Sequence, residues 1–209
     1  MDDDRLLVLY PQKRGPEKAR ARVDEVLKEA LDGINAEIVE DMDFLEQDPY
    51  RYRGRRLLFV VPLGKNGINR GYYEVLAWLR GGDQVLAGAT AGMIIDAESE
   101  FYTKATAREL AVAANRAGCA FVGRPLVEGT ASLDNYLIQA ANMNTDRFGA
   151  YKKSAQILAH EILETEWEPK KEAHLLVLHA SNHRTSNTLA IWQKVKEQLD
   201  DRIKIQEVN

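Results

Sequence analysis

The feature that most constrains the fold is a regular alternation of short apolar runs with segments of helical periodicity. Five runs of the kind that buried strands show come before residue 125, at residues 6–10, 36–39, 57–61, 84–95 and 119–122. Strands and helices that alternate in this way predict a parallel sheet with helices on both faces and right-handed crossovers. The sequence therefore predicts an α/β domain with five parallel strands.

The expected helices fill the spaces between these runs and continue past the last one. The first helix is opened by Pro16 and stopped by Gly33, as each residue's backbone preference favours. Further helices are expected at residues 72–79, 103–117, 133–143 and 151–166, and residues 167–171 are interpreted as a linker. A length of 209 residues suits one domain plus a remainder, or two small domains.

Composition argues against several classes of protein. The net charge is -4 with acidic and basic residues interleaved, so no basic stripe indicates nucleic-acid binding. No apolar run approaches the roughly 20 residues that span a bilayer. The single cysteine, Cys119, excludes an internal disulfide framework and fits a reducing cytoplasm, and the four histidines lack metal-ligand spacing.

A strand, a polar loop and a helix are expected after the linker, at residues 174–178, 179–185 and 186–199, with a further strand at residues 203–205. The loop and the start of the helix carry hydroxyls, amides and a guanidinium: Ser181, Asn182, Arg184, Thr185, Ser186, Asn187 and Thr188. Together with the free N–H groups of a helix N-terminus, these groups make a candidate phosphate-binding loop. The alternative is an ordinary loop in which Ser186 or Asn187 caps the helix.

Ser181, Arg184 and the Ser-Asn-Thr sequence at residues 186–188 follow an apolar strand, and this arrangement resembles the first strand-to-helix turn of the NADPH-dependent FMN reductase family. The resemblance implies a flavodoxin-like fold, with strand order 2-1-3-4-5, in which this loop binds the FMN phosphate and NADPH is the reductant. The chain departs from the family pattern at residues 179–180, where the family usually has Gly before the serine, and at His183, where Pro is common.

Three loops of the first domain should also meet at the carboxyl ends of its strands, where such folds bind ligands. The loop at residues 10–15 has Lys13 and Arg14 but no Ser or Thr, so it lacks the hydroxyls that the family uses on a phosphate. The loop that begins at Pro62 and contains Gly64 and Asn66 resembles the family's turn against the flavin ring, although it could be a plain turn. The acidic residues at 96–100 are expected to face solvent and would repel a phosphate.

A denser resemblance covers residues 89–136. These residues resemble the amino-terminal region of larger, uncharacterised flavodoxin-family proteins, in which a complete FMN-reductase-like unit follows. We therefore expect a flavodoxin-like domain at residues 1–168 and an incomplete start of a second unit at residues 174–209. A β-α-β segment alone cannot cover both faces of its sheet. It should pack on the first domain, pair with another chain in a homodimer, or belong to a longer protein, and we favour the last of these.

Two functions follow from the sequence. The first is a flavoprotein oxidoreductase that uses FMN and NADPH, in which the cofactor supplies the redox chemistry and no side chain is assigned a catalytic role. The second is a non-catalytic flavodoxin-like domain that has lost its cofactor and serves in dimerisation or docking. The sequence does not identify the electron acceptor.

Overall fold

The computed structural model describes residues 5–11, 16–41, 45, 47–166, 173–180 and 186–208. The chain divides into two compact units, Met1–Trp167 and Glu168–Asn209, and each is described by itself. No helix in the described residues is long and apolar enough to cross a membrane.

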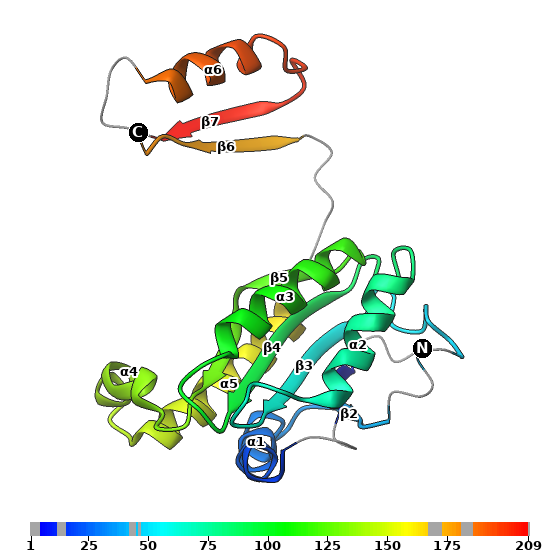
Figure 1. The fold of residues 1–209 in the computed structure, drawn as a ribbon, viewed down its shortest axis with the longest axis vertical. Coiled ribbons are helices and arrows are strands. Elements are labelled where there is room, and N and C mark those ends of the chain that lie inside the picture. The colour runs from blue at the N-terminus through cyan, green and yellow to red at the C-terminus, as the bar shows by residue number, and fades with distance from the viewer. Residues whose placement is uncertain are drawn as a thin grey trace. The chain divides into compact units, whose positions relative to one another are not determined.

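The first unit is built on a five-stranded parallel sheet (Figure 1). Its strands are β1 (Leu6–Leu9), β2 (Ala36–Val39), β3 (Arg56–Leu63), β4 (Thr90–Ala97) and β5 (Ala120–Gly129). The strand order is β2-β1-β3-β4-β5, and every neighbouring pair is parallel. This order defines a flavodoxin-like fold, so the fold class expected from the sequence is confirmed.

Helices cover both faces of this sheet and divide its core into two layers. One layer contains α1 (Glu17–Ala30) and α5 (Arg147–Glu164), together with the short helices η2 (Asp134–Tyr136) and α4 (Leu137–Asn142). The other contains α2 (Arg70–Gly81) and α3 (Thr103–Arg116). Alternate strand residues face opposite layers: Leu58 and Val60 lie in the first, and Leu57 and Phe59 in the second.

Strand β3 is longer than the sequence predicts, because it continues through Pro62 to Leu63. A proline in a central strand would normally remove a ladder hydrogen bond. Here β1 ends at Leu9, which pairs with Phe59, so β3 has no β1 partner at Pro62 and pairs there only with β4. The expected ligand turn therefore begins at Gly64 rather than at Pro62.

Strand β4 begins and ends later than predicted. Residues 84–89 form turns, since Gln84 and Gly88 have positive φ values of 51° and 76°, which an extended strand cannot contain. At the other end β4 continues to Ala97, so Asp96 lies within the strand. The prediction that Asp96 faces solvent is wrong, because the residue is fully buried.

Strand β5 also runs well past its predicted end and contains an irregularity. Ala91 pairs with Phe121 but Met93 pairs with Leu126, so residues 122–125 stand opposite the single β4 residue Gly92. Extra residues of this kind bend a strand and redirect its side chains. They fall on an edge strand of the sheet.

The second unit is a β-α-β segment, as the sequence predicts. Strands β6 (His174–Leu178) and β7 (Lys204–Val208) are parallel, and α6 (Asn187–Lys196) connects them. Glu207 of β7 links the elements of this segment. It accepts hydrogen bonds from Trp192 (3.1 Å) and Lys196 (2.6 Å) and is also hydrogen-bonded to His179 (2.8 Å). The bond to Lys196, then those to His179 and Trp192, lower the pKa of Glu207 to about 2.

Candidate functional site

The carboxyl-terminal edge of the first sheet is where an open parallel sheet binds its ligand, at the point where the strand order reverses. Here the chain goes from β1 to β2 in one direction and then to β3 on the other side of β1. The loops after β1, β3 and β4 therefore lie around this edge. The Lys13 and Arg14 positions in the first loop lie outside the described residues.

An ion pair lies at the end of β4. Arg22, from α1, donates to both carboxylate oxygens of Asp96, from Nη2 to Oδ1 at 2.7 Å and from Nε to Oδ2 at 2.9 Å. The same guanidinium donates to the carbonyl oxygens of Ala97 (2.9 Å) and Ala131 (3.2 Å). Arg22 thus ties α1 to β4 and to the segment after β5.

Tyr151 of α5 completes the environment of Asp96. Its hydroxyl donates to Asp96 Oδ2 at 3.0 Å, and both side chains are fully buried. Burial raises the pKa of Asp96 to about 6, although Arg22 and Tyr151 act in the opposite direction. Gly129 makes room for this group, since a Cβ there would lie 2.2 Å from Asp96 Oδ2.

Glu98 lies at the N-terminus of α1. Its Oε1 accepts a hydrogen bond from the backbone N–H of Ala19 at 3.3 Å. A helix N-terminus is a natural anion site, and here a carboxylate of the chain itself lies there. The cavity beside it, lined by Lys18, Ala19, Arg22, Glu98 and Ala131, has a volume of about 60 Å³. That is far below the roughly 300–1,000 Å³ of usual small-molecule pockets.

The loop after β3 is likewise held by contacts with the chain itself. Gly64 accepts from the N–H of Gly67 at 2.9 Å, and Asn66 is exposed at the tip. Gly67 has a φ of 70°, and the ring of Tyr102 packs so closely that a Cβ at residue 67 would lie 2.4 Å from it. Asn69 then caps α2, accepting from Tyr72 N–H at 3.1 Å and donating to the Pro62 carbonyl at 2.7 Å.

The predicted phosphate-binding loop of the second unit is described only in part. Ser181, Asn182, Arg184 and Thr185 lie outside the described residues, whereas Ser186, Asn187 and Thr188 form the start of α6. Ser186 occupies the N-cap position of α6, and its side chain makes no capping hydrogen bond. Asn187 and Thr188 are exposed in the first turn.

The functional residues expected from the sequence do not include Arg22, Tyr151 or Asn69. A signal for Arg22 was present, because it lies three residues after Ala19 and four before Val26, on the apolar stripe of its helix. A charged residue on a buried helix face needs a partner, and the buried Asp96 is that partner. In the described parts of the chain no group of three or more His, Cys, Asp or Glu side chains is arranged to hold a metal ion.

Comparison with known proteins finds no matching protein family and no matching curated protein. Among solved structures, a flavone reductase aligns with a TM-score of 0.49 and 12% identity over 77% of this chain. The chain spans 63% of that protein's length. A short-chain flavodoxin associated with a bacterial microcompartment gives a TM-score of 0.45 and 12% identity, over 75% of this chain and 95% of the flavodoxin.

Oxidised flavodoxin 1 from Bacillus cereus aligns with a TM-score of 0.42 and 15% identity, over 71% of this chain and 97% of its own. At these identities and TM-scores, the likenesses carry no argument about the ligand or the function of this chain. The flavodoxin-like fold itself is established by the strand order and parallel pairing of β1 to β5.

The two units differ in how well their residues fit a flavin phosphate. In the first unit, the Glu98 carboxylate would repel a phosphate at the start of α1, and the adjoining cavity is too small for a flavin. In the second unit, the start of α6 presents the hydroxyls of Ser186 and Thr188 and the amide of Asn187. Neutral donors of this kind suit a phosphate.

Proposed function

We propose that this chain is part of an FMN-dependent oxidoreductase reduced by NADPH, and that its two units have different roles. Residues 181–188 of the second unit bind the FMN phosphate, and the first unit carries no flavin but serves as a dimerisation or docking domain. The observation that carries the proposal is a contrast between two helix N-termini. Glu98 lies at that of α1, whereas the Ser186 hydroxyl makes no bond to the start of α6.

Electrostatics favours the second unit as the phosphate site. A phosphate at the start of α6 would meet a positive helix end, hydroxyl groups and the guanidinium of Arg184. A phosphate at the start of α1 would have to displace the Glu98 carboxylate and approach the acidic residues at 96–100. Bound FMN would supply the hydride and electron chemistry, and the residues of this chain would hold and orient it.

The β-α-β order of the second unit supports the proposal that it begins a second flavodoxin-like domain. Strands β6 and β7 are parallel neighbours joined by α6, just as β1 and β2 are joined by α1. Large apolar side chains at Leu176, Leu178 and Ile191 are exposed in this unit. We propose that they are covered by the rest of a second flavodoxin-like unit, or by a second copy of the chain in a homodimer.

FMN binding tests the cofactor site. We expect FMN, followed by its fluorescence, to bind this chain weakly, because the β-α-β segment offers a single strand-to-helix turn with which to hold the flavin. Arg184→Ala should weaken binding about ten- to a hundredfold, the value of one charge-assisted contact. Lys13→Ala, the matched control in the first unit, should change it little.

Riboflavin, which has the ring but no phosphate, should not compete for this site. If Lys13→Ala abolished FMN binding and Arg184→Ala did not, the flavin would belong to the first unit and the proposal would be wrong. For the docking role, light scattering coupled to size exclusion should detect dimers that grow with protein concentration. A clean monomer at high concentration would count against a dimerisation role.

A further inference from the structure

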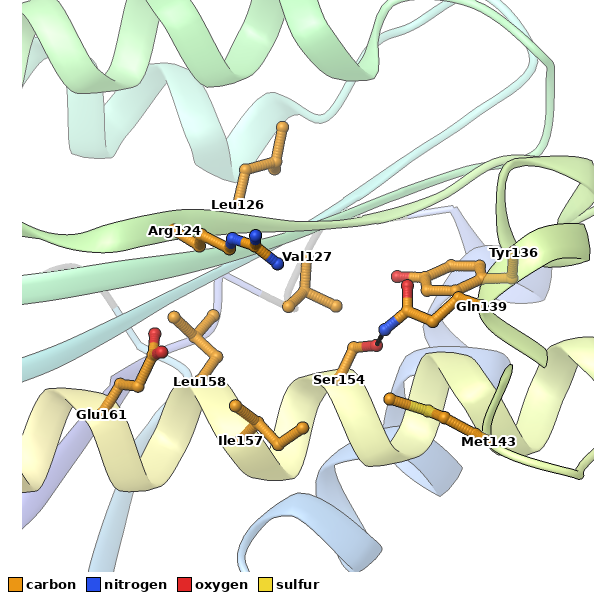
Figure 2. Close-up of a pocket in the computed structure, with 10 residues that line it drawn as sticks. All are labelled: Arg124, Leu126, Val127, Tyr136, Gln139, Met143, Ser154, Ile157, Leu158 and Glu161. Atoms are coloured by element: carbon orange, nitrogen blue, oxygen red, sulfur yellow. Dashed lines mark hydrogen bonds between the residues drawn. The ribbon is translucent and has the colours of Figure 1, made fainter. Parts of the chain in front are cut away.

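A second and larger cavity lies at the β5 edge of the first unit. It has a volume of about 330 Å³ and lies between β5, α5 and the η2–α4 segment (Figure 2). Its lining residues are Arg124, Leu126, Val127, Tyr136, Gln139, Met143, Ser154, Ile157, Leu158 and Glu161. The volume is at the low end of small-molecule pockets, roughly 300–1,000 Å³, so it suits a metabolite smaller than a flavin nucleotide.

The middle of the cavity is apolar. Val127 and Leu158 are buried, and Ile157 extends the same wall along α5. These aliphatic side chains offer contact area to an apolar group but no hydrogen bonds. The cavity therefore selects a ligand with an apolar body.

One end of the cavity carries two opposite charges that do not bond each other. Arg124 comes from the irregular part of β5 and Glu161 from α5, and Figure 2 shows them at the same end with no hydrogen bond between them. Within the described residues neither charged group has an ion pair or a side-chain hydrogen bond. A guanidinium and a carboxylate that line the same cavity and are unpaired can each bind a ligand group of opposite charge.

The other end is polar but neutral. Gln139 donates from Nε2 to the hydroxyl of Ser154 at 2.8 Å, and Ser154 donates to the Ala150 carbonyl at 2.6 Å, so the amide is held in place. Tyr136 lines the same end and stacks on Tyr151 with ring centroids 5.4 Å apart. Burial raises the pKa of Tyr136, so its hydroxyl stays neutral at physiological pH.

We propose that this cavity binds a free α-amino acid with an apolar or aromatic side chain. The carboxylate of the ligand pairs with Arg124, its ammonium pairs with Glu161, and its side chain lies along Val127, Ile157 and Leu158. A dianionic phosphate is disfavoured, because Glu161 would repel it and Arg124 is a single cation. The site is separate from the proposed flavin site and does not rest on it.

Isothermal titration of the whole chain with L-phenylalanine and L-leucine tests the site. We expect both to bind, and two analogues to bind at least tenfold more weakly: 3-phenylpropanoate, which lacks the ammonium, and 2-phenylethylamine, which lacks the carboxylate. Arg124→Gln and Glu161→Gln should each lower the affinity for L-phenylalanine about ten- to a hundredfold. The matched controls Arg108→Gln and Glu164→Gln, which do not line the cavity, should leave it unchanged.

Nuclear magnetic resonance on the unmodified protein provides a second measurement, in case a variant misfolds. L-phenylalanine should shift the side-chain signals of Arg124 Nε and Gln139 Nε2. The proposal is overturned if neither amino acid binds at about 10 mM, which corresponds to a binding free energy weaker than about 3 kcal/mol. It is equally overturned if the analogues bind as tightly as L-phenylalanine, or if these two side-chain signals do not move.

Discussion

Replacing Arg22 by Met should destabilise the first unit, and the loss should grow with pH. Arg22 makes two hydrogen bonds to the fully buried Asp96 and two to backbone carbonyls. Removing one partner of a buried ion pair leaves an uncompensated charge and costs about 3–5 kcal/mol. We expect a loss of that size at pH 8, where the Asp96 carboxyl is ionised.

The pH dependence follows from the pKa of Asp96. Its pKa is raised from 3.8 to about 6, so the folded protein binds the proton more tightly than the unfolded chain. The stability linked to this proton is fully present below pH 3.8 and is lost as pH rises through 6, by roughly 3 kcal/mol. In the Arg22→Met variant the pKa of Asp96 should rise further. Asp96 is then protonated at pH 5, and this removes much of the cost of burying its charge.

Urea unfolding of the first unit, followed by circular dichroism at pH 5 and pH 8, measures both effects. The double variant Arg22→Met/Asp96→Asn is the control: with no buried charge it should recover much of the stability at pH 8 and lose the pH dependence. Equal losses for Arg22→Met at the two pH values, or a loss below about 1 kcal/mol at pH 8, would refute the role assigned to this ion pair.

Three further outcomes follow from packing and exposure. Gly92→Ala should cost about 1–3 kcal/mol in thermal or urea unfolding, because its Cβ would lie 2.6 Å from Leu158, whereas Gly123→Ala meets nothing within 4 Å and should be nearly neutral. Equal effects would contradict this packing. Burial raises the pKa of the Cys119 thiol to about 12, so this thiol should react slowly with a thiol reagent in the folded protein and at once in urea. Rapid labelling of the folded protein would refute this prediction. Leu178 is 70% exposed and should promote self-association, so Leu178→Lys should lower the dimer fraction in sedimentation experiments. An unmodified chain that is already monomeric would contradict the role of Leu178 in self-association.

The fold could be predicted from the sequence because apolar strands such as residues 57–61 are distinct from the helical segments around them. Strand ends were less predictable, since they depend on neighbours that the sequence does not identify. Pro62 is compatible with a strand only because β1 stops short of it. Likewise, β5 continues past Gly123 and Pro125 because an edge strand tolerates irregularity.

The candidate site was predicted less completely, for an electrostatic reason. A run of acidic residues such as 96–100 usually faces solvent, and only the fold reveals that Asp96 meets a cation from a helix more than 70 positions earlier. The polar residues near the start of α6 were recognisable, because a helix N-terminus has a local sequence pattern. Arg124 and Glu161 gave no such signal, since they come together only through packing of α5 beside β5.

If the proposed function is correct, a flavin phosphate binds at the start of α6 and not at the start of α1. Amide chemical shifts of the whole chain, followed by nuclear magnetic resonance while FMN is added, test it directly. We predict that FMN shifts the amide signals of Asn187 and Thr188 and that riboflavin does not. The amide signals of Ala19 and Glu98 should stay unchanged. Shifts at Ala19 and Glu98, with none at Asn187 and Thr188, would contradict it.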